Sequence, residues 1–135
     1  MFDRKINVGL ISNSRVREVY LSDKDLNKLK KFANFFWMEC NEESSWDHPP
    51  VSNKEVINNI KKFSRDLDAL VVCHGSPLID DNIMKNCDNL KFIGELEGDR
   101  FSQRVDLDAA FNNNIVVVDT TNGCSDAVAE WALGL

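Results

Sequence analysis

The sequence predicts an α/β domain in which five parallel strands form a doubly wound sheet with helices on both faces. Short, nearly continuous apolar runs alternate with segments in which apolar residues recur every three to four positions. Such runs are typical of strands buried on both faces, and such segments are typical of amphipathic helices. A length of 135 residues suits one domain of this class. The expected topology is therefore flavodoxin-like.

The five predicted strands are apolar runs bounded by polar or turn-forming residues. The clearest is LDALVVC, a β-branched run that ends in the turn sequence His-Gly-Ser-Pro. KINVGLI supplies the first strand and IVVV the last. In chain order, we expect strands at 5–11, 35–38, 67–73, 90–96 and 115–118.

The segments between these runs predict the helices. Ser22 is a suitable N-cap for a helix whose apolar face carries Leu26, Leu29, Phe32 and Ala33. Residues 12–14 are expected to supply loop and cap chemistry. The remaining helices are expected at 53–65, 79–87, 106–112 and 125–135.

Composition limits the possible partners. Sixteen Lys and Arg residues against 22 Asp and Glu residues give a net charge of −6, so nucleic acid and anionic membranes are not expected partners. No apolar run approaches the roughly 18–20 residues that span a bilayer. The N-terminus lacks a small-residue cleavage site. We therefore expect a cytoplasmic protein.

The cysteines are expected to be free thiols. Cys40, Cys73, Cys87 and Cys124 are far apart and form no CxxC pair, which argues against disulfides and against a zinc site. Cys124 lies at a predicted helix N-terminus, where the helix dipole lowers a thiol pKa, so a reactive thiol is an open alternative there.

Ligand-binding residues are expected in the loops at the carboxyl ends of the strands. His74 could act as a general acid or base, or could be a loop histidine bonded to backbone. The N–H groups and hydroxyl of Gly75-Ser76 suit a carboxylate or phosphate. Arg100 and Arg104 could bind an anion, or could pair with Glu95, Glu97 and Asp99. No GxGxxG, P-loop or GxSxG sequence is present.

The last predicted helix, VAEWALGL, is apolar on nearly all sides. Such a helix requires burial against another surface. We therefore expect a domain at 1–124 and, at 125–135, the start of a helix that links this fragment to a further domain. The alternative is that the helix packs on its own sheet.

Four motifs in the second half resemble, in order, the substrate-binding domain of the D-isomer-specific 2-hydroxyacid dehydrogenases. LKFIG at 90–94 resembles the strand before that family's glycine-containing substrate loop. VDLDAA at 105–110 and IVVVD at 115–119 are similar to the next helix and strand. VAEWAL at 128–133 resembles the helix that leads into the nucleotide-binding domain.

The resemblance implies the substrate-binding lobe of an NAD- or NADP-dependent oxidoreductase that oxidises a D-2-hydroxy acid or reduces the 2-keto acid. Family members usually form homodimers. In that family the nucleotide fingerprint and the catalytic arginine, acid and histidine follow the VAE helix. We therefore expect no catalytic residue in this chain, and no activity from it alone.

The resemblance also assigns site residues. Substrate N–H donors fall at Gly75-Ser76 and at 97–99, where Glu97 replaces the family's first glycine and the following loop is longer. The family's substrate-facing asparagine corresponds to Cys124, with Asn122 as a nearby replacement. The expected substrate-binding residues are Gly75, Ser76, Glu97, Gly98, Asp99, Asn122 and Cys124, with Ser125 at the cofactor and no metal ligand.

Two further classes remain open. The altered glycine loop is compatible with a non-enzymatic, nucleotide-sensing regulator. A stand-alone small-molecule-binding flavodoxin-like module is the other alternative. A response-regulator-like module would need an acidic cluster where this chain has Ser12-Asn13 and His74-Gly75.

Overall fold

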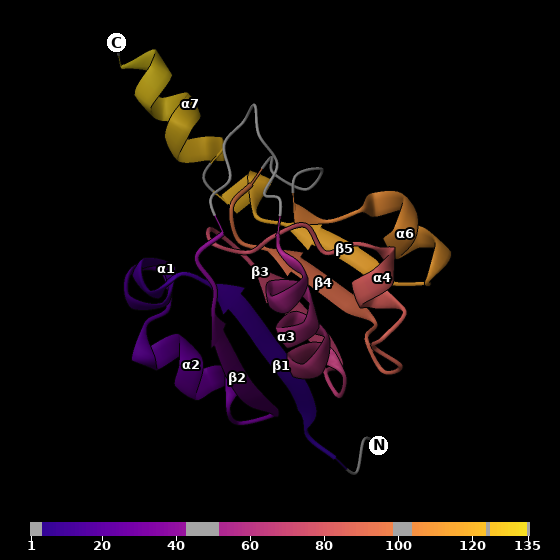
Figure 1. Ribbon diagram of the computed structural model, residues 1–135. Coiled ribbons are helices and arrows are strands. Elements are labelled where there is room, and N and C mark those ends of the chain that lie inside the picture. The colour runs from indigo at the N-terminus through magenta and orange to yellow at the C-terminus, as the bar shows by residue number, and fades with distance from the viewer. Residues whose placement is uncertain (1–3, 43–51, 99–103, 124, 135) are drawn as a thin grey trace.

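The computed structural model describes residues 4–42, 52–98, 104–123 and 125–134 (Figure 1). Five parallel strands form one sheet in the order β2-β1-β3-β4-β5. This order confirms the predicted doubly wound, flavodoxin-like topology. The connection from β1 to β2 runs over one face of the sheet and the later connections run over the other, because the strand order reverses between β1 and β3.

Every predicted strand is present, with bounds shifted by a few residues. The strands are β1 Ile6–Ser12, β2 Ala33–Glu39, β3 Ala69–Val72, β4 Phe92–Glu95 and β5 Val116–Asp119. The helices are α1 Ser14–Val19, α2 Asp23–Leu29, α3 Lys54–Ser64, α4 Asp81–Met84, α6 Leu107–Asn112 and α7 Ser125–Leu133, with a 3-10 turn, η1, at Thr121–Gly123. Ser22 caps α2 as predicted, by accepting a hydrogen bond from the N–H of Asp25.

The connection from β1 to β2 differs from the prediction in two ways. The predicted cap chemistry is present, since the Asn13 side chain accepts the Val16 N–H at 2.9 Å, but it begins a helix, α1, that was not predicted. This helix has six residues and buries only Val16, so the sequence shows no repeating pattern of apolar residues there. The apolar face expected on α2 is shorter than predicted, since Phe32 is exposed and Ala33 begins β2.

The main core lies between one face of the sheet and α3, α4 and α6. Ile60 of α3 and Ile83 of α4 are fully buried with Leu70 of β3 and Ile93 of β4. Burial of each such side chain stabilises the fold by about 1.5–3 kcal/mol. On the opposite face, a separate group is buried where α1 and α2 lie beside β1 and β2: Val8, Leu10, Val16, Leu26 and Ala33.

That opposite face is uncovered over β4 and β5. The parallel register places Phe92 beside Val116 on this face, and both side chains are exposed, as is Val118. The helix α7 leaves the sheet after η1 and projects away from it (Figure 1). None of its described residues is buried, so the alternative that α7 packs on its own sheet is not what the structure has.

Candidate functional site

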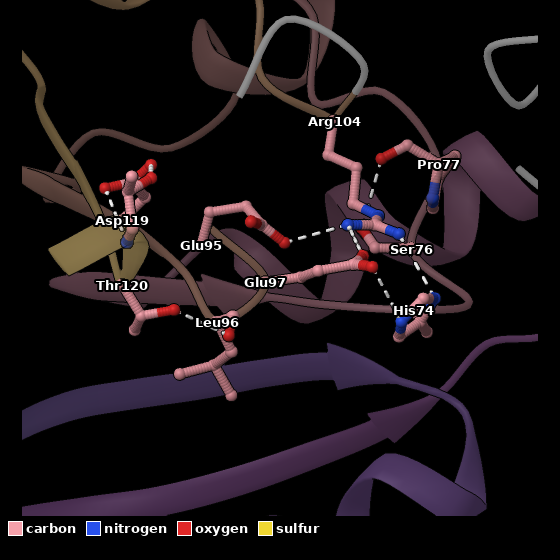
Figure 2. Close-up of polar contacts among 10 residues, drawn as sticks. His74, Ser76, Pro77, Glu95, Leu96, Glu97, Arg104, Asp119 and Thr120 are labelled. Atoms are coloured by element: carbon pink, nitrogen blue, oxygen red, sulfur yellow. Dashed lines mark hydrogen bonds and ion pairs between the residues drawn. The ribbon is translucent and has the colours of Figure 1, made fainter. Parts of the chain in front are cut away.

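A buried arginine joins the loops that follow β3 and β4 (Figure 2). The Arg104 side chain is 0% exposed, and its NH1 group donates to Glu95 Oε1 at 2.9 Å and to Glu97 Oε2 at 2.7 Å. The NH2 group lies 3.4 Å from His74 Nδ1. A buried guanidinium needs such partners, because an unpaired charge costs several kcal/mol to bury. Of the two predicted roles for Arg104, the structure therefore has the ion pair.

The contacts of His74 indicate the hydrogen-bonding role of each ring nitrogen. Its Nε2 atom lies 3.0 Å from Glu97 Oε1, and its Nδ1 atom faces Arg104. A guanidinium only donates, so Nδ1 accepts and Nε2 carries the proton toward the carboxylate. The predicted backbone-bonded histidine was wrong in its partner, since the ring binds a carboxylate. Both ring nitrogens have a polar partner in this structure.

Glu95 is the most unusual carboxyl in this cluster. It ends an apolar strand, is 1% exposed, and its Oε2 atom has no hydrogen-bond partner among the described residues. Burial raises the pKa of Glu95 to about 7, and Arg104 only partly opposes this. Near neutral pH the carboxyl is therefore partly protonated. The sequence analysis named Glu95 only as an ion-pair partner, although a glutamate within the apolar run LKFIGELE is also a signal of burial.

Gly75 and Ser76 are buried where the ends of the first three strands meet. Gly75 has a φ of 93°, and a Cβ there would lie 2.1 Å from the Cys40 carbonyl oxygen, so only glycine fits. The Ser76 N–H donates to Cys73 O at 3.0 Å, and its hydroxyl donates to Pro77 O at 3.0 Å. Both Ser76 donors expected to face a ligand are engaged within the protein.

Gly98 brings the loop after β4 against the chain that follows β5. A Cβ at Gly98 would lie 2.6 Å from Thr121 Cα. Nearby, the Thr120 hydroxyl donates to Leu96 O at 2.8 Å. These contacts join Glu97 and Gly98, both predicted to bind substrate, to the segment that leads into α7.

The other expected site residues are only partly described. Ser125 is the exposed first residue of α7, and its hydroxyl donates to Thr121 O at 3.0 Å. Lying outside the described residues are Asp99, Arg100, Cys124 and the side chain of Asn122. The reactive-thiol alternative for Cys124 therefore also lies outside them.

The cysteine prediction holds for the three cysteines that the structure describes. Cys40, Cys73 and Cys87 are free and buried. Burial raises the pKa of Cys73 and of Cys87 to about 11, so both remain thiols at neutral pH. Among the described residues, no group of three or more potential metal ligands comes together. No helix in the described part is long and apolar enough to cross a membrane.

Known proteins resemble this chain in structure but not detectably in sequence. No protein-family model matches it, and no curated protein matches it. An acyclic imino acid reductase in complex with NADPH and D-Arg matches with a TM-score of 0.59 and 18% identity, over 96% of this chain and 36% of that one. The NAD⁺-bound 3-phosphoglycerate dehydrogenase of Entamoeba histolytica matches with a TM-score of 0.57 and 21% identity, over 97% and 38%.

A third match is the pyruvate reductase of Chlamydomonas reinhardtii, with a TM-score of 0.56 and 16% identity, over 87% of this chain and 29% of that one. This chain thus spans about a third of the length of the solved structures it matches. These likenesses confirm the predicted fold. By their names, these three matched structures are two reductases and one dehydrogenase.

Proposed function

We propose that this chain is a lobe of a nicotinamide-dependent oxidoreductase, and that its β3 and β4 loops bind a D-2-hydroxy acid or the 2-keto acid. One observation carries the proposal: nearly the whole chain matches enzymes solved with NADPH and with NAD⁺. In doubly wound sheets, ligands bind beyond the carboxyl ends of the strands. The four family-like motifs, in the correct order, support the same function.

In this function the lobe binds and orients the substrate, while the cofactor supplies the hydride chemistry. The Glu97-Gly98 segment is the first candidate for the substrate carboxylate, because both donors of Ser76 are engaged internally. A bare Glu97 carboxylate would repel an anionic substrate. Arg104 offsets that charge at 2.7 Å, which makes the departure from the family's glycine compatible with the proposed role.

The proposal includes NAD or NADP as the cofactor, with Ser125 approaching it. Asp99, Asn122 and Cys124 complete the proposed substrate contacts. The catalytic arginine, acid and histidine would come from a further domain, and the whole enzyme would be a cytoplasmic homodimer.

The test uses the natural protein that carries this sequence, in its full length. Turnover of 2-keto acids such as pyruvate, hydroxypyruvate and phenylpyruvate is followed by the loss of reduced-nicotinamide absorbance. Nicotinamide-dependent reduction of one of these acids would support the proposal. Nucleotide binding without turnover would favour the regulator, and neither binding nor turnover would refute the oxidoreductase.

A pair of glycine variants tests the loop itself. Gly98→Ala places a Cβ 2.6 Å from Thr121 Cα, so we expect a higher KM for the keto acid through displacement of the loop. Gly134→Ala is the matched control, because its Cβ would meet no atom closer than 3.5 Å. An unchanged KM in Gly98→Ala would exclude this loop from the substrate site.

A further inference from the structure

A pocket of about 370 Å³ opens between α1 and the loop after β3. The Asn13 N–H donates to His74 O at 2.8 Å and joins these two walls. The strand order reverses between β1 and β3, which is a preferred ligand position in doubly wound sheets. Neither Glu97 nor Gly98 lines the pocket. Its lining residues are Asn13, Arg15, Val16, Val19, Tyr20 and His74.

The polar groups of this pocket are donors that the fold does not use. Within the described part of the chain, the Arg15 guanidinium and the Tyr20 hydroxyl make no hydrogen bond or ion pair. The Asn13 side chain accepts the Val16 N–H through Oδ1, which leaves its Nδ2 group as a donor. Three unengaged donors therefore line one pocket.

Because no carboxylate lines this pocket, we expect its ligand to be negatively charged. The chain carries 22 acidic residues and a net charge of −6, yet none of the six lining residues is acidic. A second pocket, of about 380 Å³, is lined by Asp81, Asp106 and Asp108, and its Lys85 pairs with Asp81 at 2.5 Å. The pocket beside α1 presents a cation that is unpaired among the described residues, and no carboxylate lines it, so it suits an anion.

The other lining residues are largely apolar, so we expect the uncharged part of the ligand to be apolar as well. Val16 is buried in the wall, whereas the neighbouring Val19 and Tyr20 are 66% and 62% exposed. Two adjacent exposed apolar side chains around a hollow gain burial when an apolar or flat group covers them. A small inorganic ion would leave them in water.

We propose that this pocket binds a small organic anion: a carboxylate or phosphate monoester on an apolar or aromatic body. Arg15 and the Asn13 amide hold the anionic group, and Val19 and Tyr20 cover the body. The ring of His74 lies between this pocket and Glu97, to which its Nε2 donates at 3.0 Å. This site goes beyond the proposed dehydrogenase function and does not depend on it.

The test titrates the full chain with benzoate and with phenyl phosphate, followed by the NMR signals of backbone amides and of the Arg15 Nε–H group. We expect saturable shifts confined to residues 13–20 and His74. The probe that binds more tightly identifies the anionic group. Its counterpart without a ring, acetate or inorganic phosphate, should bind about tenfold more weakly or worse.

Matched variants separate the pocket from general charge effects. Arg15→Gln should weaken the tighter probe by about tenfold or more. Lys24→Gln removes an exposed charge from the neighbouring α2 outside the pocket, and should leave the affinity within about twofold. Tyr20→Ala should weaken the aromatic probe but not acetate.

Three results would overturn the proposal. They are shifts spread over exposed lysines and arginines, wild-type affinity in Arg15→Gln, and acetate or phosphate binding as tightly as the ring-bearing probe. Nicotinamide-dependent turnover is a separate measurement on the same protein. Its absence together with saturable benzoate binding would refute the dehydrogenase and leave this site standing.

Discussion

Replacement of Glu95 with glutamine should change how the stability of the fold depends on pH. The Glu95 carboxyl is 1% exposed, and burial raises its pKa from 4.5 to about 7. Because the folded-state pKa lies above the unfolded one, the folded protein binds the proton more tightly. The stabilisation from this proton is complete below about pH 4.5 and is lost as the pH rises through about 7.

The magnitude follows from the two pKa values. The difference between 4.5 and about 7 corresponds to about 3 kcal/mol of unfolding free energy, at about 1.4 kcal/mol per pKa unit. Glutamine keeps the shape of the side chain and an oxygen acceptor for Arg104, but it does not titrate. Between about pH 5 and about pH 8, the wild type should therefore lose about 2.5 kcal/mol more than Glu95→Gln.

Urea unfolding followed by far-ultraviolet circular dichroism at several pH values measures this difference. We expect the two proteins to have similar stability near pH 5 and Glu95→Gln to be the more stable near pH 8. Parallel pH profiles would show that Arg104 keeps Glu95 ionised in the folded protein. That result would refute the argument that desolvation outweighs the ion pair at this position.

Three further substitutions test the packing around this cluster. Gly75→Ala forces a Cβ against the Cys40 carbonyl oxygen at a φ of 93°, and should cost at least about 2 kcal/mol in urea unfolding. Arg104→Met leaves two carboxylates without their cation, and should cost about 3 kcal/mol near pH 8 but less near pH 5, where Glu95 can take up a proton. Ile60→Ala empties a fully buried site and should lower the unfolding free energy by about 2–5 kcal/mol without changing the urea m-value.

Much of the fold was predictable because its determinants are local. The strand β3 is a β-branched run that ends in a turn sequence, and each strand has a comparable signal. Ser22 and Asn53 precede their helices and cap them, through bonds to N–H groups three residues later. The parallel arrangement of the sheet followed from the alternation of strands and helices, because parallel strands require crossovers.

The features that were not predicted from the sequence depend on burial, on the shortness of a helix, or on contact between segments that are far apart in the chain. The helix α1 is too short to show a period, and its only buried residue is Val16. The sequence showed that Arg104 stands near several acidic residues, but not which of them would share its burial. The pocket that contains Arg15 and Tyr20 was missed because it is lined by α1 and by a loop about 60 residues away, which only the tertiary structure brings together.

The charge balance at the carboxyl edge of β4 explains how this loop can carry two glutamates where an anion is expected. Arg104 contributes one positive charge, Glu97 one negative charge, and a protonated Glu95 none. Below the pKa of Glu95, the three groups therefore sum to about zero charge. Above it, they carry a net negative charge that would oppose a substrate carboxylate. Glu97 Oε1 also lies 3.0 Å from His74 Nε2, and His74 lines the pocket beside α1. The charges around the buried Arg104 are therefore connected to that pocket through Glu97 and His74.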